Sequence, residues 1–239
     1  MTAEGAGIRK RLGQGAMVVS SILVAFAVDA LWEESKERRD LNDDLANIAL
    51  ELEENRNRAV YHLDMAQRMA NALDALYLAI DTDGPTPLLA DTTVWLAHIT
   101  PTLDASLGAI DALIASGRMA VVDNPELSRR LAGLRGRVED AVEEQVQAQE
   151  IHFTRVLPEL DDLDHQATRH ISDAFWAQAR IPGRQLEYRG QVVHPGGPTL
   201  LTALSLRHTL STVTVGELRD LLDELDLIER LVEDEVGGV

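Results

Sequence analysis

An uncharged apolar run near the N-terminus limits what this chain can fold into more than any other feature of the sequence. Residues 9–11 are all basic, and residues 12–28 contain no charged side chain. After one acidic interruption, three further uncharged residues extend the run to 21 residues, and about 20 suffice to cross the ~30 Å hydrocarbon layer of a bilayer. The sequence therefore predicts a transmembrane helix over residues 12–32, preceded by a basic cytoplasmic tail over residues 1–11.

Several side chains of this predicted span are candidates for contact with the membrane or with other membrane helices. Trp32 would lie at the level of the lipid headgroups, where an indole ring is favoured. Asp29 lies about one turn inside that boundary and could reach the interface or bond to a neighbouring protein helix. Ser20, Ser21 and Ala25 are small enough for a second helix to approach closely.

Two alternatives to a retained span fit the same residues. One is a helix buried in a protein core. The other is a cleaved signal peptide, since a basic segment, an apolar stretch and the sequence at residues 25–27 (Ala-Phe-Ala) match that design. The apolar run passes into a helical pattern without a break, which favours a retained anchor.

The basic residues that flank the span do not decide its orientation. Three precede it, and Lys36, Arg38 and Arg39 follow it. Because the first group lies on a short tail, we expect the N-terminus in the cytoplasm. The remaining domain would then lie in the periplasm, anchored in a bacterial inner membrane.

A heptad pattern begins directly after the span. Apolar residues recur at a spacing of 3.5 over nearly six heptads, which is typical of a helix that packs along one seam. No Pro or Gly occurs between Asp29 and Asp83, so the span should continue as a stalk helix over residues 33–80. Asn55 and His62 weaken the stripe in its middle. They either make hydrogen bonds in a core or set the register with a partner helix, and a homodimer through the stalk follows from the second interpretation.

Residues 81–239 are expected to form an acidic helical domain that packs on the stalk, which makes the chain all-α. Pro101 should kink or split a helix over residues 92–116. A short extended piece should precede a long helix that has Asn124 as its cap and Pro125 at its first position. Pro158 should break that helix near residue 156.

The C-terminal third is expected to contain three more helices and at most one small hairpin. The helices should cover residues 159–180 and 199–210 and a last segment for which Thr214 and Glu217 form a capping box. The hairpin would pair residues 186–188 with residues 191–193.

Charge and composition exclude several kinds of function. The chain carries a net charge of −18 at pH 7 and contains no cysteine. A domain this acidic repels phosphate backbones, so nucleic acid is not an expected partner. The lack of cysteine excludes disulfides, thiolate catalysis and Cys-ligated metals.

Two motifs link the chain to a known type of protein. Residues 29–38 read Asp-Ala-Leu-Trp-Glu-Glu-Ser-Lys-Glu-Arg, and Ser116-Gly117 is followed at a distance by Asn124, Leu127 and Leu131. Together they resemble a family of small bacterial single-span membrane proteins of unknown function. The chain departs from that family's pattern at the first two positions of the exit motif, where Asn residues are usual. The resemblance covers roughly residues 8–150, and it implies the single-span topology without implying an activity.

No catalytic or cofactor motif is found in the sequence. An acidic cluster between Glu159 and His165 could bind a cation weakly but lacks the spacing of a calcium loop. An irregular segment around Arg184, Tyr188 and Arg189 is a candidate recognition surface, because loops often carry binding residues.

These observations favour a non-enzymatic accessory subunit that contributes assembly or stabilising contacts to a larger membrane complex, with respiratory and photosynthetic assemblies as candidate hosts. Its expected partners are integral membrane proteins and the lipid bilayer, with no cofactor. A self-associating membrane-anchored sensor or stalk is the main alternative. A hydrolase with a dispersed site is the third.

Overall fold

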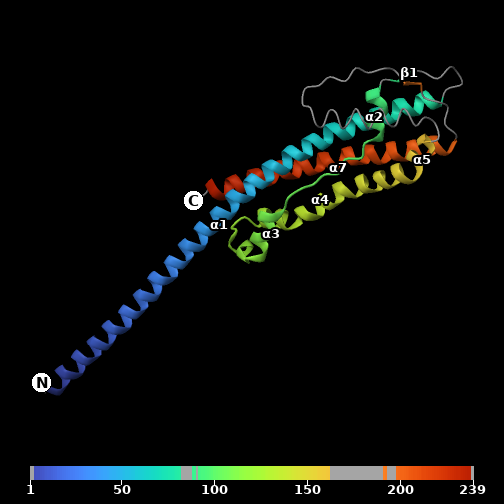
Figure 1. The fold of residues 1–239 in the computed structure, drawn as a ribbon. Helices are drawn as coiled ribbons and strands as arrows, with labels where there is room; N and C mark the ends of the chain where they lie inside the picture. Colours follow the sequence, from blue (N-terminus) through green and yellow to red (C-terminus); the bar gives the residue numbers. More distant parts are fainter. Residues whose placement is uncertain (1–2, 82–87, 90, 162–190, 193–197, 238–239) are drawn as a thin grey trace.

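Three long helices make up most of the structure: α1 (Ala3–Ile80), α4 (Pro125–Ile151) and α7 (Pro198–Gly237). α7 runs antiparallel to the other two and packs against both (Figure 1). The computed structural model describes residues 3–81, 88–89, 91–161, 191–192 and 198–237.

Helix α1 is a single element of 78 residues that projects far beyond the bundle at its N-terminal end (Figure 1). It ends at Ile80, the residue at which the stalk helix was predicted to end, and it begins at Ala3, within the segment predicted as a tail. Its first buried residue is Leu41, which is 2% exposed. The bundle therefore begins there, and the preceding part of the helix has no described neighbour apart from contacts close to the bundle's end.

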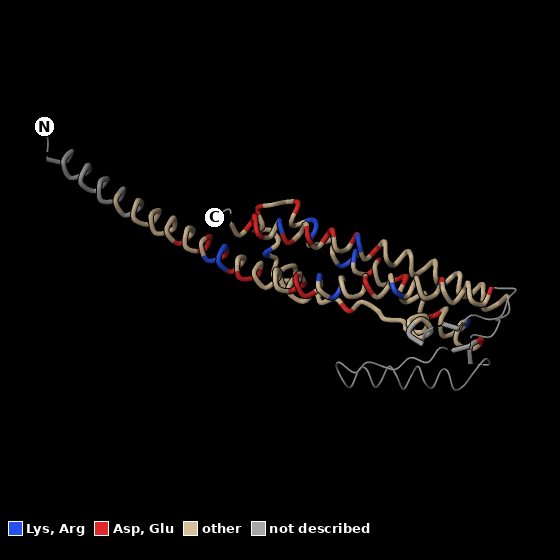
Figure 2. Tube along the Cα trace, turned by 90° about the horizontal axis from the view of Figure 1, so that it is seen from above, with Lys and Arg blue, Asp and Glu red and all other residues tan. Residues whose placement is uncertain are grey.

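The predicted heptad stripe of α1 is buried within the chain. Leu45, Ile48, Leu52 and Leu73 are all 0% exposed. They pack into clusters with apolar side chains of α4, α7 and the intervening segments. Figure 2 shows Lys, Arg, Asp and Glu spread along the bundle and along the adjoining residues 29–40 of α1, whereas residues 17–28 carry no charge.

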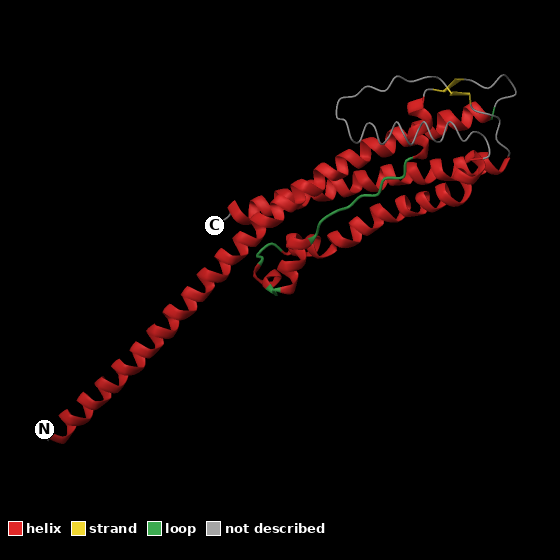
Figure 3. Cartoon of the chain, viewed as in Figure 1, coloured by secondary structure: helices red, strands yellow, loops and turns green. Residues whose placement is uncertain are grey.

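The predicted helix over residues 92–116 is split more extensively than expected. It comprises α2 (Asp91–His98), an extended strap over residues 99–107, and α3 (Gly108–Ala115). The strap, drawn as the green loop in Figure 3, runs antiparallel to α1 and α4 and lies between them. Pro101 disfavours helix for the residue before it and removes one backbone N–H. The strap takes the place that the second helix would have in an up-down-up-down four-helix bundle.

The connection from α3 to α4 follows the sequence signals in part. Gly117 ends α3 with φ of 76°, a left-handed conformation that glycine adopts readily. The next residues form a 3-10 turn, η1 (Arg118–Val121), which corrects the predicted extended piece. Asn124 caps α4 as predicted, since its side chain accepts hydrogen bonds from the N–H groups of Glu126 and Leu127.

Pro158 does not end the helical path after α4, contrary to prediction. A π-helical turn, η2 (His152–Val156), is followed directly by α5 (Leu157–Asp161). In a π-turn the N–H groups bond five residues back, as Leu157 does to the carbonyl of His152. This wider turn accommodates the proline ring, which would otherwise clash with a carbonyl four residues earlier. The predicted helix over residues 159–180 lies mainly outside the described residues.

Helix α7 replaces the two C-terminal helices that were predicted. It runs without interruption for 40 residues, so the capping box at Thr214 is not a helix start. Thr214 is 4% exposed and Leu218 is fully buried against the other helices. Burial of a continuous apolar face here outweighs the local capping preference.

Two strands of two residues form the described β-structure. β1 (Leu88–Leu89) pairs antiparallel with β2 (Gln191–Val192). In the predicted hairpin this second strand paired instead with residues 186–188, which lie outside the described residues. The observed pairing joins the segments that follow α1 and precede α7. Both lie at the same end of the bundle, since Ile80 and Leu200 share one apolar cluster.

Among the described residues, no helix is both long enough and apolar enough to cross a membrane. The side chains of residues 12–16, 18 and 19 of the predicted span are outside that description.

Candidate functional site

The five candidate contact residues of the predicted span all lie on the projecting part of α1. Ser20, Ser21, Ala25, Asp29 and Trp32 are exposed along it. The Ser21 hydroxyl donates a hydrogen bond of 2.8 Å to the backbone carbonyl of the residue four positions earlier. Its polarity is thereby partly satisfied within the helix, as is common for serine in apolar helices.

Large apolar side chains point outward on all sides of α1 between Met17 and Trp32, and no other described part of the chain covers them. The exposed fraction reaches 67% for Phe26 and 66% for Trp32. The other large apolar side chains of this part lie between 49% and 73% exposed, namely Met17, Ile22, Leu23, Val24, Val28 and Leu31. A helix that is apolar on all sides is normally buried in a protein or a membrane. In this structure these side chains are exposed, and no other described part of the chain buries them.

The other predicted contact set cannot be placed. Arg184, Tyr188 and Arg189 lie outside the described residues. The acidic cluster between Glu159 and His165 also lies mostly outside them.

The bundle is tied to α1 close to the projecting segment. Arg38 Nη1 lies 2.7 Å from Asp123 Oδ2, just before α4. This ion pair raises the pKa of Arg38 and lowers that of Asp123, mainly through their hydrogen bond. Further along α1, Asp44 Oδ2 lies 2.6 Å from Nη2 of Arg118, the first residue of η1. These contacts fix the near end of the bundle against the stalk.

Polar side chains of α1 bind the backbone of the strap and of α3. The Asn55 side chain accepts a hydrogen bond of 2.9 Å from Ser106 N and donates one of 2.5 Å to Ser106 O. The Glu51 carboxylate accepts from the N–H of Ala109 at 3.0 Å and from that of Ile110 at 3.4 Å. Since these are free N–H groups in the first turn of α3, Glu51 caps α3 from another helix.

Helix α4 holds the same strap from its other side. Gln145 Oε1 accepts a hydrogen bond of 2.7 Å from Leu103 N, and the amide's Nε2 donates to Ala141 O. Gln145 is 6% exposed, and Leu103 is equally buried. The strap is therefore bound through its backbone by side-chain amides and through its leucines by the apolar core.

Arg207 of α7 binds the end of α2 and the start of the strap. It is 0% exposed, its Nη1 donates to Ala97 O, and its Nη2 donates to Ile99 O at 2.5 Å. Carbonyls at a helix C-terminus lack intrahelical donors and carry partial negative charge. Among the described residues no carboxylate pairs with Arg207, and burial lowers its pKa to about 10.

His152 completes this buried group. Its Nδ1 lies 3.1 Å from Arg207 Nη1, and the His98 ring meets its ring edge-on at 5.6 Å between centroids. Burial first, then the positive charge of Arg207, lowers the pKa of His152 to about 3. His152 is therefore neutral, and its Nδ1 serves as an acceptor for the guanidinium.

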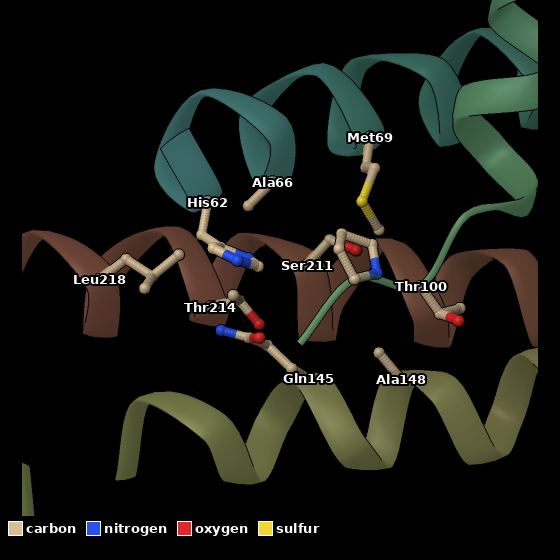
Figure 4. Close-up of a pocket in the computed structure, with 10 residues that line it drawn as sticks. His62, Ala66, Met69, Thr100, Gln145, Ala148, Ser211, Thr214 and Leu218 are labelled. Atoms are coloured by element: carbon tan, nitrogen blue, oxygen red, sulfur yellow. The ribbon is translucent and has the colours of Figure 1, made fainter. Parts of the chain in front are cut away.

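A small cavity lies between the three long helices beside the strap (Figure 4). Figure 4 shows His62 of α1 and Gln145 of α4 directed toward it. Burial lowers the pKa of His62. The cavity measures about 20 Å³, which is room for one water molecule and far below the roughly 300 Å³ of a typical ligand pocket.

Asn55, Gln145 and the two Nη groups of Arg207 thus bind the chain's own backbone, whereas Arg207 Nε and Glu144 Oε2 are buried without a hydrogen-bond partner among the described residues. Asn55 was recognised from the sequence, and the structure places it in satisfied core hydrogen bonds. Gln145 and Arg207 were missed. Arg207 lies seven residues after Leu200 and seven before Thr214, both of which are buried on α7, so a charged residue inside that repeat was the signal available.

Comparison with known proteins adds no relative. No family model matches the chain, and neither a curated protein nor a solved structure matches it. The resemblance to single-span bacterial proteins therefore rests on the two motifs alone.

Proposed function

We propose that this chain is a non-enzymatic, membrane-anchored accessory subunit of a larger bacterial membrane complex. The observation that supports it best is the projecting part of α1, with large apolar side chains exposed on all sides. At about 1.5 Å per residue, the proposed span over residues 12–32 is about as long as the ~30 Å hydrocarbon layer is thick. The proposal places the N-terminus in the cytoplasm and the acidic bundle in the periplasm.

The small and polar residues of the span support a protein partner within the membrane. Ser21 and Ala25 are four residues apart and share one face of α1, so a second helix could approach there. Asp29 lies about one turn further on, close to the same face. An acidic side chain at this depth is stabilised by a hydrogen-bond donor on a neighbouring helix. We therefore expect an integral membrane protein to contact this face.

The bundle itself supports a structural contribution over a catalytic one. Its buried polar side chains bind backbone atoms of the strap, and His152 faces the guanidinium of Arg207. A hydrolase would need a nucleophile beside such a histidine. Self-association through the heptad stripe is also disfavoured, because Leu45, Ile48 and Leu52 are fully buried within one chain. A homodimer using these positions would first have to open the bundle.

Extraction from the native membrane with a mild detergent tests the proposal. We expect the chain to migrate with a larger protein assembly, and Ala25→Leu to release it, because a larger side chain on the contact face prevents close approach. Ala27→Leu, the same substitution two residues further on and on the opposite face of the helix, is the control. Migration as a lone chain under every mild condition would contradict the proposed accessory function.

A further inference from the structure

The side chain of Arg39 runs back along α1 toward the N-terminus. Its Nε donates a hydrogen bond of 3.1 Å to Ser35 O, one turn earlier. Its guanidinium carbon lies 5.7 Å from the centre of the Trp32 ring. Seven residues separate the two positions, or about 10 Å of helix. The cation is therefore displaced from its own backbone toward the indole that marks the proposed membrane boundary.

Arg39 differs from its basic neighbours in lacking an acidic partner. Lys36 pairs with Glu33 at 3.8 Å, and Arg38 pairs with Asp123 at 2.7 Å. No carboxylate of the described chain forms an ion pair with Arg39. The residue four positions earlier is Ser35, whereas Arg58 and Arg68 find carboxylates at that spacing. An acidic segment thus contains one basic side chain that is held in place but not neutralised.

The donors that remain on Arg39 suit one class of ligand. A guanidinium carries five N–H donors, and the described contact uses only the one on Nε. The four on Nη1 and Nη2 form a planar fork that matches two oxygens of a phosphate. The cation–π contact with Trp32 and the hydrogen bond to Ser35 O hold the guanidinium beside the indole. The pair thus combines an indole that favours the interface with a cation at the same level.

We propose that Trp32 and Arg39 form a binding site for the phosphate of a phospholipid headgroup. The site rests on the proposed membrane anchor, because Trp32 must lie at the bilayer surface for lipid to reach it. An anionic lipid such as phosphatidylglycerol is the preferred occupant, since its phosphate carries no neighbouring ammonium to compete with Arg39. A single basic side chain near the surface should enrich such a lipid about five-fold.

Fluorescence quenching by brominated lipids tests this site in the full chain. Trp95→Phe and Trp176→Phe leave Trp32 as the sole indole, and the protein is placed in bilayers with an equal fraction of brominated phosphatidylglycerol or brominated phosphatidylcholine. We expect phosphatidylglycerol to quench Trp32 more strongly. Arg39→Gln should remove this excess, whereas Arg38→Gln, which changes the net charge equally, should retain it.

The possible results distinguish failure of the proposed lipid site from failure of the proposed membrane anchor. Equal quenching by both lipids, or equal effects of the two arginine variants, would overturn the site. Loss of the excess on adding inorganic phosphate would overturn its assignment to a lipid. Absence of quenching by either lipid would instead reject the anchor. If the double-Phe background loses helicity, counting the phosphatidylglycerol retained by Arg39→Gln and Arg38→Gln in native mass spectrometry makes the same comparison.

Discussion

The side-chain amide of Asn55 and the backbone of Ser106 exchange two hydrogen bonds, of 2.5 and 2.9 Å. Asn55 is 2% exposed in the middle of the apolar stripe of α1. The amide thus binds the strap as a neighbouring β-strand would, and it sets the position of the strap along α1. Polar interruptions of an apolar seam are often attributed to pairing with a second chain; here the partner is a segment of the same chain.

Replacing this amide should destabilise the bundle. Asn55→Ala leaves Ser106 N and Ser106 O without partners, so we expect a loss of about 2–3 kcal/mol. Thermal unfolding of the full chain in mild detergent, followed by circular dichroism, measures it. Asn57→Ala, an exposed position on the same helix, is the matched control and should leave the transition nearly unchanged. Equal effects of the two variants would show that the strap contact contributes nothing.

Arg207 should matter most for the local stability of α2 and the strap. Arg207→Met leaves two carbonyls and the Nδ1 of His152 unpaired, although it also relieves a buried charge. We expect a net loss of about 2 kcal/mol and faster hydrogen exchange at residues 97–103. Arg219→Met, exposed on the same helix, should change neither. Unchanged exchange in Arg207→Met would contradict the capping of α2 by this side chain.

The depressed pKa of His152 predicts a loss of stability in mild acid. Its pKa is about 3 in the folded chain and about 6.5 when unfolded. Below pH 6.5 the unfolded state therefore binds a proton that the folded state does not. Stability is full above that pH and falls toward pH 3, by about 2 kcal/mol at pH 5. His62, whose pKa is also lowered, acts in the same direction.

The predicted loss of stability in acid can be checked by measuring the thermal unfolding midpoints of the wild type and of His152→Gln between pH 7.5 and 5. The variant should show a flatter pH dependence, because glutamine cannot bind the proton. His208→Gln, on α7, serves as a control for the loss of any histidine. Parallel pH curves for wild type and His152→Gln would contradict the assigned pKa.

Signals local to one helix were sufficient where no distant contact competed with them. The unbroken course of α1 from Asp29 to Ile80 followed from the absence of Pro and Gly there, although the helix also continues back through four glycines to Ala3. Gly117 and Asn124 end and begin helices as their residue types predict. The apolar seam of α1 was also predicted in detail. The segments that pack on this seam could not be predicted, because the same heptad pattern fits a partner helix in another chain or in this one.

The errors arose where tertiary contacts outweigh local preference. Thr214 has the sequence of a cap, but its burial in α7 keeps the helix continuous. Pro158 is tolerated because the π-turn before it widens the helix. The strap was not anticipated as an extended segment, because Gln145 and Arg207, which bind its backbone, are far from it in sequence.

Alkaline carbonate extraction of membranes that contain the full chain tests whether α1 anchors the protein in the bilayer. We expect the wild-type chain to stay in the membrane pellet, because an apolar helix of about 30 Å retains it. Val24→Arg should shift part of the chain to the supernatant, since a charge at the centre of a span costs about 2.5–3.5 kcal/mol. Val60→Arg, on the surface of the bundle, should not. Release of the wild-type chain into the supernatant would contradict the anchor.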